Sequence, residues 1–131
     1  MKPFPEELDA RISNRPKKSW FSKTETIATV QVDFGFNSEL EGVGSIVALA
    51  GFESDGASVP RFLWSIFPPF GEYLEAAVIH DWLCVHKTVD SVTAANVFRE
   101  AMVSLGVPMW KVRCMYSAVR VAGPRFKGPK V

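Results

Sequence analysis

The adjacent residues His80 and Asp81 are the pair in this sequence whose side chains are best suited to proton transfer. Apolar residues surround the pair on every side of the helix that the segment predicts, which is typical of a buried helix. A carboxylate in such a helix is costly unless it meets a metal, a cation or several hydrogen-bond donors. Asp81 therefore indicates a site more strongly than His80, because a single core histidine is most often simply hydrogen-bonded.

A second polar group lies upstream, in the segment DGASVPR of Asp55–Arg61. One interpretation is structural: Asp55 and the glycine after it form a turn, and Ser58 caps a short helix over Arg61–Ile66. The other interpretation is functional, because the segment places a carboxylate and a guanidinium on a loop between strands and helices, where sites are common.

Two more polar groups fall on the helices predicted later in the chain. Asn96 lies nearly opposite the apolar stripe of its helix, so it faces either solvent or the helix that carries the His-Asp pair. On the last helix, Arg113 and Arg120 share a face with Tyr116 between them. These three side chains would bind a phosphate or carboxylate, or the arginines would form salt bridges with the upstream aspartates, which is the interpretation that we favour.

The order of the elements predicts the fold. Apolar residues alternate with polar ones in Ala28–Phe34, which indicates a half-buried strand. Ser45–Ala50 is predicted to be a second, wholly apolar strand, and Trp20 and Phe21 are predicted to belong to an earlier edge strand. Glycine and proline positions then delimit three helices, predicted at Leu74–His86, Thr93–Leu105 and Pro108–Ala122. Strands followed by helices predict an α+β domain, with a small N-terminal antiparallel sheet and a bundle of about three helices.

Composition limits the function classes. A chain of 131 residues, 47% hydrophobic and 22% charged, is expected to be one domain over residues 1–131. Its net charge of +1 argues against specific nucleic-acid binding, although basic residues gather near both ends, which we expect to be extended. The sequence contains no glycine-rich phosphate loop, HExxH, paired CxxC or nucleophile elbow, and no apolar run near the roughly 20 residues of a transmembrane helix.

The two cysteines and the second histidine have ordinary structural interpretations. Cys84 and Cys114 fall in predicted helices, where we expect free, buried thiols rather than a disulfide or a metal site. His86, near the end of its helix, is expected to be exposed and to interact with the helix dipole.

From about residue 46 to residue 123, the sequence resembles a phage and prophage family called domain of unknown function 1353. Two positions depart from the family pattern: Ser54 replaces a threonine, and Asn96 replaces an aspartate. The matching residues are Gly51-Phe52, Asp55–Arg61, Leu63-Trp64, Pro69, Gly71, Ala76-Ala77, His80-Asp81, Leu83, Ala95, Phe98, Ala101-Met102 and Gly106-Val107.

This resemblance implies phage origin and no settled activity. The sequence also has a more distant similarity to small phospholipase A2 enzymes, which implies a hydrolytic reaction. In that scheme His80 is the base that activates water, Asp81 and Asp55 bind calcium, and Asn96 orients the histidine. Calcium takes six to eight oxygen ligands, which two carboxylates, carbonyls and water provide. Asparagine orients an imidazole, but it does not stabilise an imidazolium as an anion does.

Two functions are therefore expected. The first is a virion- or tail-associated structural or assembly protein, in which Asp55, Arg61, His80 and Asp81 form a buried polar network and other phage structural proteins are the partners. The alternative is a calcium-assisted phospholipase or esterase that acts on host-envelope lipids. We favour the first because Asn96 lacks the family carboxylate. The first residues lack the apolar run of a secretory signal, so we expect synthesis in the host cytoplasm and incorporation into the virion.

Overall fold

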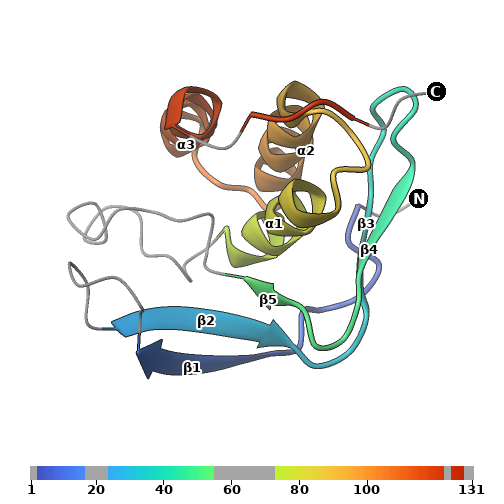
Figure 1. Ribbon diagram of the computed structural model, residues 1–131. Helices are drawn as coiled ribbons and strands as arrows, with labels where there is room; N and C mark the ends of the chain where they lie inside the picture. Colours follow the sequence, from blue (N-terminus) through green and yellow to red (C-terminus); the bar gives the residue numbers. More distant parts are fainter. Residues whose placement is uncertain (1–2, 17–23, 55–72, 123–124, 129–131) are drawn as a thin grey trace.

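Strands occupy the first half of the chain and helices the second in the computed structural model, which describes residues 3–16, 24–54, 73–122 and 125–128 (Figure 1). This order confirms the predicted α+β class. The elements are β1 (Ala10–Pro16), β2 (Thr24–Val30), β3 (Phe34–Asn37), β4 (Ser45–Ala48), β5 (Glu53–Ser54), α1 (Leu74–His86), α2 (Ser91–Ser104) and α3 (Met109–Ala122).

The described strands form two small antiparallel sheets. One has the order β1-β2-β5, and the other is the pair β3-β4. The strand predicted at Ala28–Phe34 is therefore wrong as one element, because the chain turns between β2 and β3. At this turn the Val30 N–H donates to the Phe52 carbonyl at 2.9 Å, and the Ala50 N–H donates to Oδ1 of Asp33 at 2.8 Å. These contacts come from residues about 20 positions away, which strand periodicity does not reveal.

The N-terminal region also differs from the prediction. Residues 10–16, expected to belong to an extended basic terminus, are the edge strand β1 and pair with β2. The edge strand predicted around Trp20 and Phe21 lies outside the described residues. The predicted strand Ser45–Ala50 ends at Ala48, and the chain reverses at Gly51, whose φ of +94° is readily adopted only by glycine.

The helices match their predicted positions closely because their end signals are local. α1 has the predicted bounds, and the Lys87 N–H at its C-terminal end donates to the Leu83 carbonyl. α2 begins two residues before the predicted start and is followed by Gly106, at φ +79°. Pro108 directly precedes α3, and its carbonyl accepts the first hydrogen bonds of that helix. No helix in the described ranges is both long and apolar enough to cross a membrane.

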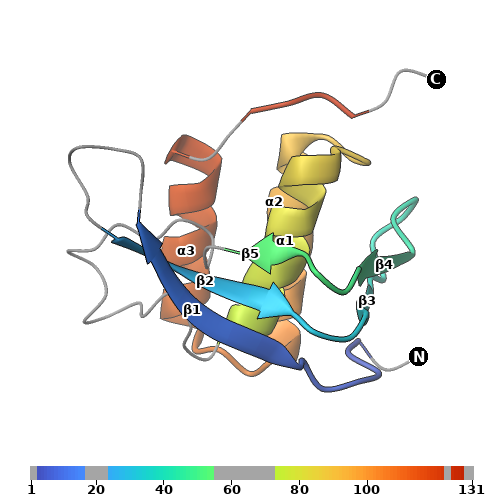
Figure 2. The ribbon, with the colours of Figure 1, turned by 60° about the horizontal axis from the view of Figure 1, so that its bottom comes forward.

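α1 is the central element of the molecule. It packs against β4 and β5 on one side and against α2 on the other, and α3 packs on α2. Seen from the sheet side, β1, β2 and β5 lie across α1 (Figure 2). The five consecutive residues 76–80 are all buried, as the all-round apolar pattern predicts. A polar side chain on this helix must therefore meet neighbouring elements rather than bulk water.

The start of α2 carries a hydrogen bond that depends on pH. The Thr93 hydroxyl donates to the carboxylate of Asp90, the N-cap residue, and this bond holds the pKa of Asp90 below its ordinary value of 3.8. A lowered pKa means that the stabilisation is present above pH 4 and is lost as the pH falls through the pKa of the folded state.

We expect Thr93→Val to lower the free energy of unfolding at pH 7 by about 0.5 kcal/mol, since the pair is partly exposed and solvent weakens it. The difference from wild type should shrink below pH 4, as measured by urea unfolding from pH 7 to pH 2.5. A difference that is constant with pH would show that the carboxylate does not carry the effect.

Candidate functional site

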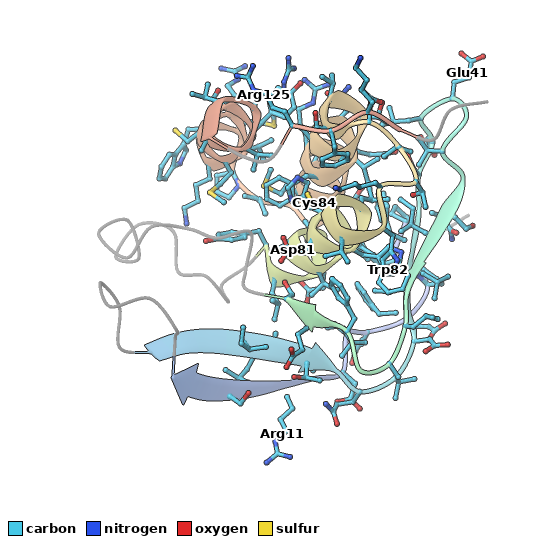
Figure 3. All side chains as sticks on the ribbon, in the orientation of Figure 1. Arg11, Glu41, Asp81, Trp82, Cys84 and Arg125 are labelled. Carbon is cyan, nitrogen blue, oxygen red and sulfur yellow. The ribbon has the colours of Figure 1, made fainter. Side chains whose placement is uncertain are left out.

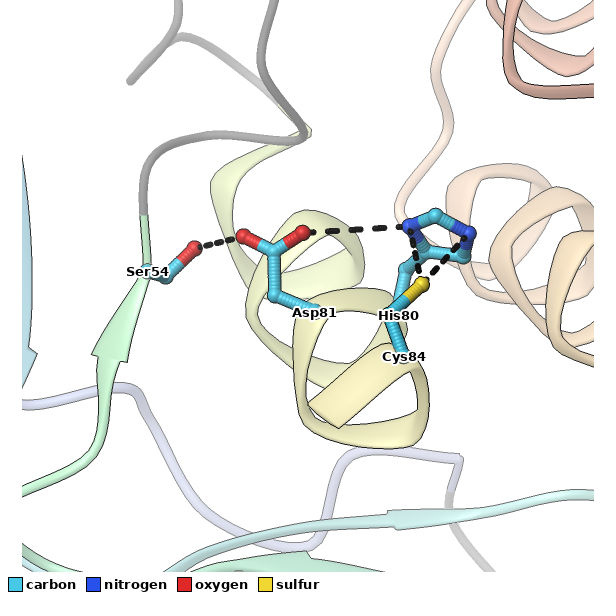
Figure 4. Close-up of polar contacts among 4 residues, drawn as sticks. All are labelled: Ser54, His80, Asp81 and Cys84. Carbon is cyan, nitrogen blue, oxygen red and sulfur yellow. Dashed lines mark hydrogen bonds and ion pairs between the residues drawn. The ribbon is translucent and has the colours of Figure 1, made fainter. Parts of the chain in front are cut away.

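His80 and Asp81 lie at the middle of α1 and meet different neighbours (Figure 4). Consecutive residues of a helix point about 100° apart, so one side chain faces the helices while the other faces the strands. Oδ2 of Asp81 accepts a 2.5 Å hydrogen bond from the hydroxyl of Ser54, on β5. Oδ1 lies 3.8 Å from Nδ1 of His80, a separation too long for a hydrogen bond. The carboxylate therefore meets a hydroxyl donor and an imidazole, as its apolar surroundings require.

The imidazole of His80 is enclosed by its neighbours. Its side chain is 6% exposed, and its ring centroid lies 5.0 Å from that of Phe98, on α2. The thiol of Cys84, one helical turn further along α1, lies 3.6 Å from Nε2 and 3.9 Å from Nδ1. A general base must reach a substrate proton directly or through one water. The described contacts of His80 instead join α1 to α2.

The remaining cysteine and histidine predictions are partly confirmed. Cys84 and Cys114 do not form a disulfide with each other, and Cys84 is half-buried beside the imidazole. Cys114 was predicted to be buried, which is wrong, because it lies on the exposed side of α3. His86 is exposed as predicted, and its ring centroid lies 3.7 Å from that of Trp82.

Asn96 is joined to α3. Its Oδ1 accepts a 2.7 Å hydrogen bond from the Tyr116 hydroxyl, which also accepts one from Nη1 of Arg120 at 2.9 Å. The guanidinium of Arg99 lies over the same tyrosine ring, 4.9 Å from its centroid. No hydrogen bond between Asn96 and His80 is found among the described residues. Asn96 was predicted to face either solvent or the helix that carries the His-Asp pair. Its side chain instead forms a hydrogen bond that joins α2 to α3.

The predicted face of α3 is formed in part. Arg120 and Tyr116 are in contact as expected, whereas Arg113 is exposed. In the described part of the chain, no salt bridge joins Arg113 or Arg120 to Asp81, and Arg120 donates to the tyrosine hydroxyl. The other predicted acidic partner, Asp55, lies outside the described residues.

Tyr116→Phe tests the bond between α2 and α3. It removes the hydroxyl from Asn96 and Arg120 and keeps the ring, so we expect the free energy of unfolding to fall by about 1 kcal/mol. Chemical denaturation measures the change. In an Asn96→Ala background the same substitution should have a smaller effect, and an undiminished effect would show that the two side chains are not coupled.

The upstream part of the predicted site lies outside the described residues. Ser58 and Arg61, like Asp55, lie outside the described residues, so their proximity to Asp81 stays a prediction. Within the described ranges, no group of three or more His, Cys, Asp or Glu side chains is arranged to hold a metal ion. Asp81 can offer carboxylate oxygens, but one of them already accepts the Ser54 hydroxyl. Calcium binding by Asp55 and Asp81 therefore also stays a prediction.

Sequence reasoning missed the role of Ser54, which is 1% exposed and connects β5 to α1. A signal was available, because serine here and threonine in the family pattern both supply a hydroxyl. It also missed the partners of Glu100, whose carboxylate accepts from the Ser38 hydroxyl at 2.6 Å and from the Glu39 N–H at 2.8 Å. That contact ties α2 to the segment after β3, 61 and 62 positions away in the sequence.

Comparison with known proteins gives a family and two curated relatives. The family model described as "Protein of unknown function (DUF1353)" matches residues 28–119, from β2 into α3. Uncharacterized protein y4jT of Sinorhizobium fredii is 45% identical over 76 residues, which are 56% of this chain and 23% of the relative. Uncharacterized protein y4iH of the same organism is 33% identical over 99 residues, which are 74% of this chain and 41% of the relative. The matched region is thus less than half of either relative, and no solved structure matches.

Proposed function

Because the chain belongs to the DUF1353 family of proteins of unknown function, we propose its role from its own site: it is a structural or assembly domain of a bacteriophage virion or tail. One observation carries the proposal. The imidazole of His80 is enclosed between Phe98 and Cys84, while the neighbouring Asp81 is bonded to Ser54 of β5. The pair thus connects α1 to β5 and to α2, as expected of a polar network in a scaffold.

The position of Asn96 supports a scaffold over the alternative, a calcium-assisted phospholipase or esterase acting on the host envelope. In the hydrolase scheme Asn96 would orient His80, but its carboxamide oxygen accepts from Tyr116 on α3. The imidazole is only 6% exposed, and its described polar neighbours are Cys84 and Asp81 of the same helix, so it is poorly placed to reach a substrate proton as a general base. The proposed scaffold role therefore involves no phospholipid substrate; only the alternative, hydrolase hypothesis does.

Two further observations support a role in assembly. In the curated relatives the matched region is a minor part of a longer chain, as expected for a domain combined with other segments. The end of α2 and the start of α3, which follow each other closely in the chain, also carry exposed apolar side chains: Val103 is 50% exposed, Met109 51% and Trp110 55%. Exposed aromatic and methionine side chains are enriched at protein interfaces. We propose that these exposed side chains contact other phage structural proteins, after synthesis in the host cytoplasm and during incorporation into the particle.

The test uses a lysogen that carries the coding sequence. We expect purified particles to contain the chain at a fixed copy number, measured by quantitative mass spectrometry. Trp110→Ala should lower that copy number about tenfold, because buried tryptophans dominate interface energies. The matched control is Val121→Ala, at a residue that is 75% exposed on α3. Absence of the chain from particles that assemble normally would contradict the proposal.

A further inference from the structure

A pocket of about 340 Å³ opens between the start of α2, the end of α3 and residues 125–127, away from the His-Asp pair. The C-terminal segment runs from the end of α3 past the start of α2 (Figure 2). It is fixed there because the Ser91 N–H donates to the Phe126 carbonyl at 2.9 Å. A Cβ atom added at Gly128 would lie 3.1 Å from the Asp90 nitrogen, so the two backbones are in close contact. The pocket is thus built by packing between segments far apart in the sequence.

Three cations surround this pocket: Arg120 from α3, and Arg125 and Lys127 from the C-terminal segment. All three side chains are exposed, and among the described residues none of them forms an ion pair with a carboxylate. The carboxylate of Asp90, at the same end of α2, is engaged by the Thr93 hydroxyl. The local charge is therefore net positive, and such an arrangement attracts an anion.

The chemistry of the lining favours phosphate among anions. Arginine donates paired hydrogen bonds in a fork that matches phosphate oxygens. The first N–H of α2 is already bonded to Phe126, so the affinity must come from the cations and the Ser91 hydroxyl rather than from the helix terminus. Val92, Val119 and Phe126 also line the pocket and give it apolar surface. The volume is about ten times that of one water molecule in the liquid, which leaves room for an organic group beside the phosphate.

We propose that this pocket binds a small organic phosphomonoester, with its phosphate held by Arg120, Arg125 and Lys127 and its organic part against Val92, Val119 and Phe126. This site is independent of the role proposed for His80 and Asp81. It also accounts for a basic C-terminal segment in a chain whose overall charge is only +1.

The experiment is a calorimetric titration of the full chain with phenyl phosphate, and in parallel with inorganic phosphate and with benzoate. We expect one molecule of phenyl phosphate per chain, bound at least fivefold more tightly than either of the others. Arg125→Gln combined with Lys127→Gln should weaken binding at least tenfold, which corresponds to about 1.4 kcal/mol at 25 °C. Because both side chains are exposed, circular dichroism should show unchanged folding.

A control matched in charge compares Arg125→Gln alone with Arg11→Gln. Each removes one positive charge, and Arg11 lies on β1, on the opposite side of the molecule from Arg125 (Figure 3). Arg125→Gln alone should weaken binding, whereas Arg11→Gln should leave the affinity within twofold of wild type. Equal weakening by Arg11→Gln would show nonspecific charge attraction and overturn the proposal. Inorganic phosphate bound as tightly as phenyl phosphate would overturn the apolar part of the site. Absence of phenyl phosphate binding at millimolar concentration would overturn the site as a whole.

Discussion

Replacing His80 with alanine is expected to lower the free energy of unfolding by about 2–5 kcal/mol, the range for truncation of a large buried side chain. The ring fills space between Phe98 of α2 and the thiol of Cys84, so its removal leaves a cavity at the junction of α1 and α2. Urea unfolding of wild type and His80→Ala measures the difference. A loss of this size is the signature of a residue that holds the fold together.

The control for this substitution is Val85→Ala on the same helix. Val85 is 64% exposed, so its truncation should change the free energy of unfolding by no more than about 0.5 kcal/mol. A His80→Ala variant that is as stable as wild type, or more stable, would also be informative. Catalytic residues are often held at the expense of stability, and replacing them can stabilise a protein. Unchanged or increased stability of His80→Ala would therefore contradict the structural role.

The second large effect is expected at the bond between Ser54 and Asp81. Asp81→Ala leaves a buried hydroxyl without this acceptor, which should lower the free energy of unfolding by about 1–3 kcal/mol. In a double-mutant cycle with Ser54→Ala, the coupling energy should lie between about 0.5 and 3 kcal/mol. Such coupling would show that β5 is held on α1 through this pair.

The matched control for the cycle is Ser45→Ala. Ser45 also donates a hydrogen bond from its hydroxyl, to Asn37 in the other sheet, but it is exposed. Its coupling to Asp81→Ala should be near zero, because residues without shared partners contribute additively. An equally small coupling energy between Ser54→Ala and Asp81→Ala would contradict the claim that this carboxylate holds β5 on α1.

The parts of the fold predicted correctly are those that depend on local signals. Residues 76–80 of α1 are buried because apolar residues occupy all faces of this helix, and its predicted bounds are those of the structure. The same pattern predicted that the carboxylate of Asp81 would have a polar partner, and in the structure it accepts a hydrogen bond from the Ser54 hydroxyl. Helix ends at glycine and proline were also placed to within two residues.

The parts that were missed depend on contacts between distant segments. β1 has the sequence ARISNRP, which lacks an alternating apolar pattern, and its strand conformation comes from pairing with β2. The break after Val30 depends on its bonds to Gly51 and Phe52. The partner of Asn96 depends on how α2 is rotated against α3, which a helical wheel for one helix does not determine.

The central claim, that His80 and Asp81 hold the fold rather than catalyse a reaction, is tested most directly by an assay for fatty-acid release from phospholipid vesicles. Wild-type protein is incubated with and without millimolar calcium, beside His80→Gln and Asp81→Asn variants that circular dichroism shows to be folded. The scaffold account predicts no release above buffer from any of the three proteins. Calcium-dependent release by wild type that is abolished in both variants would contradict it.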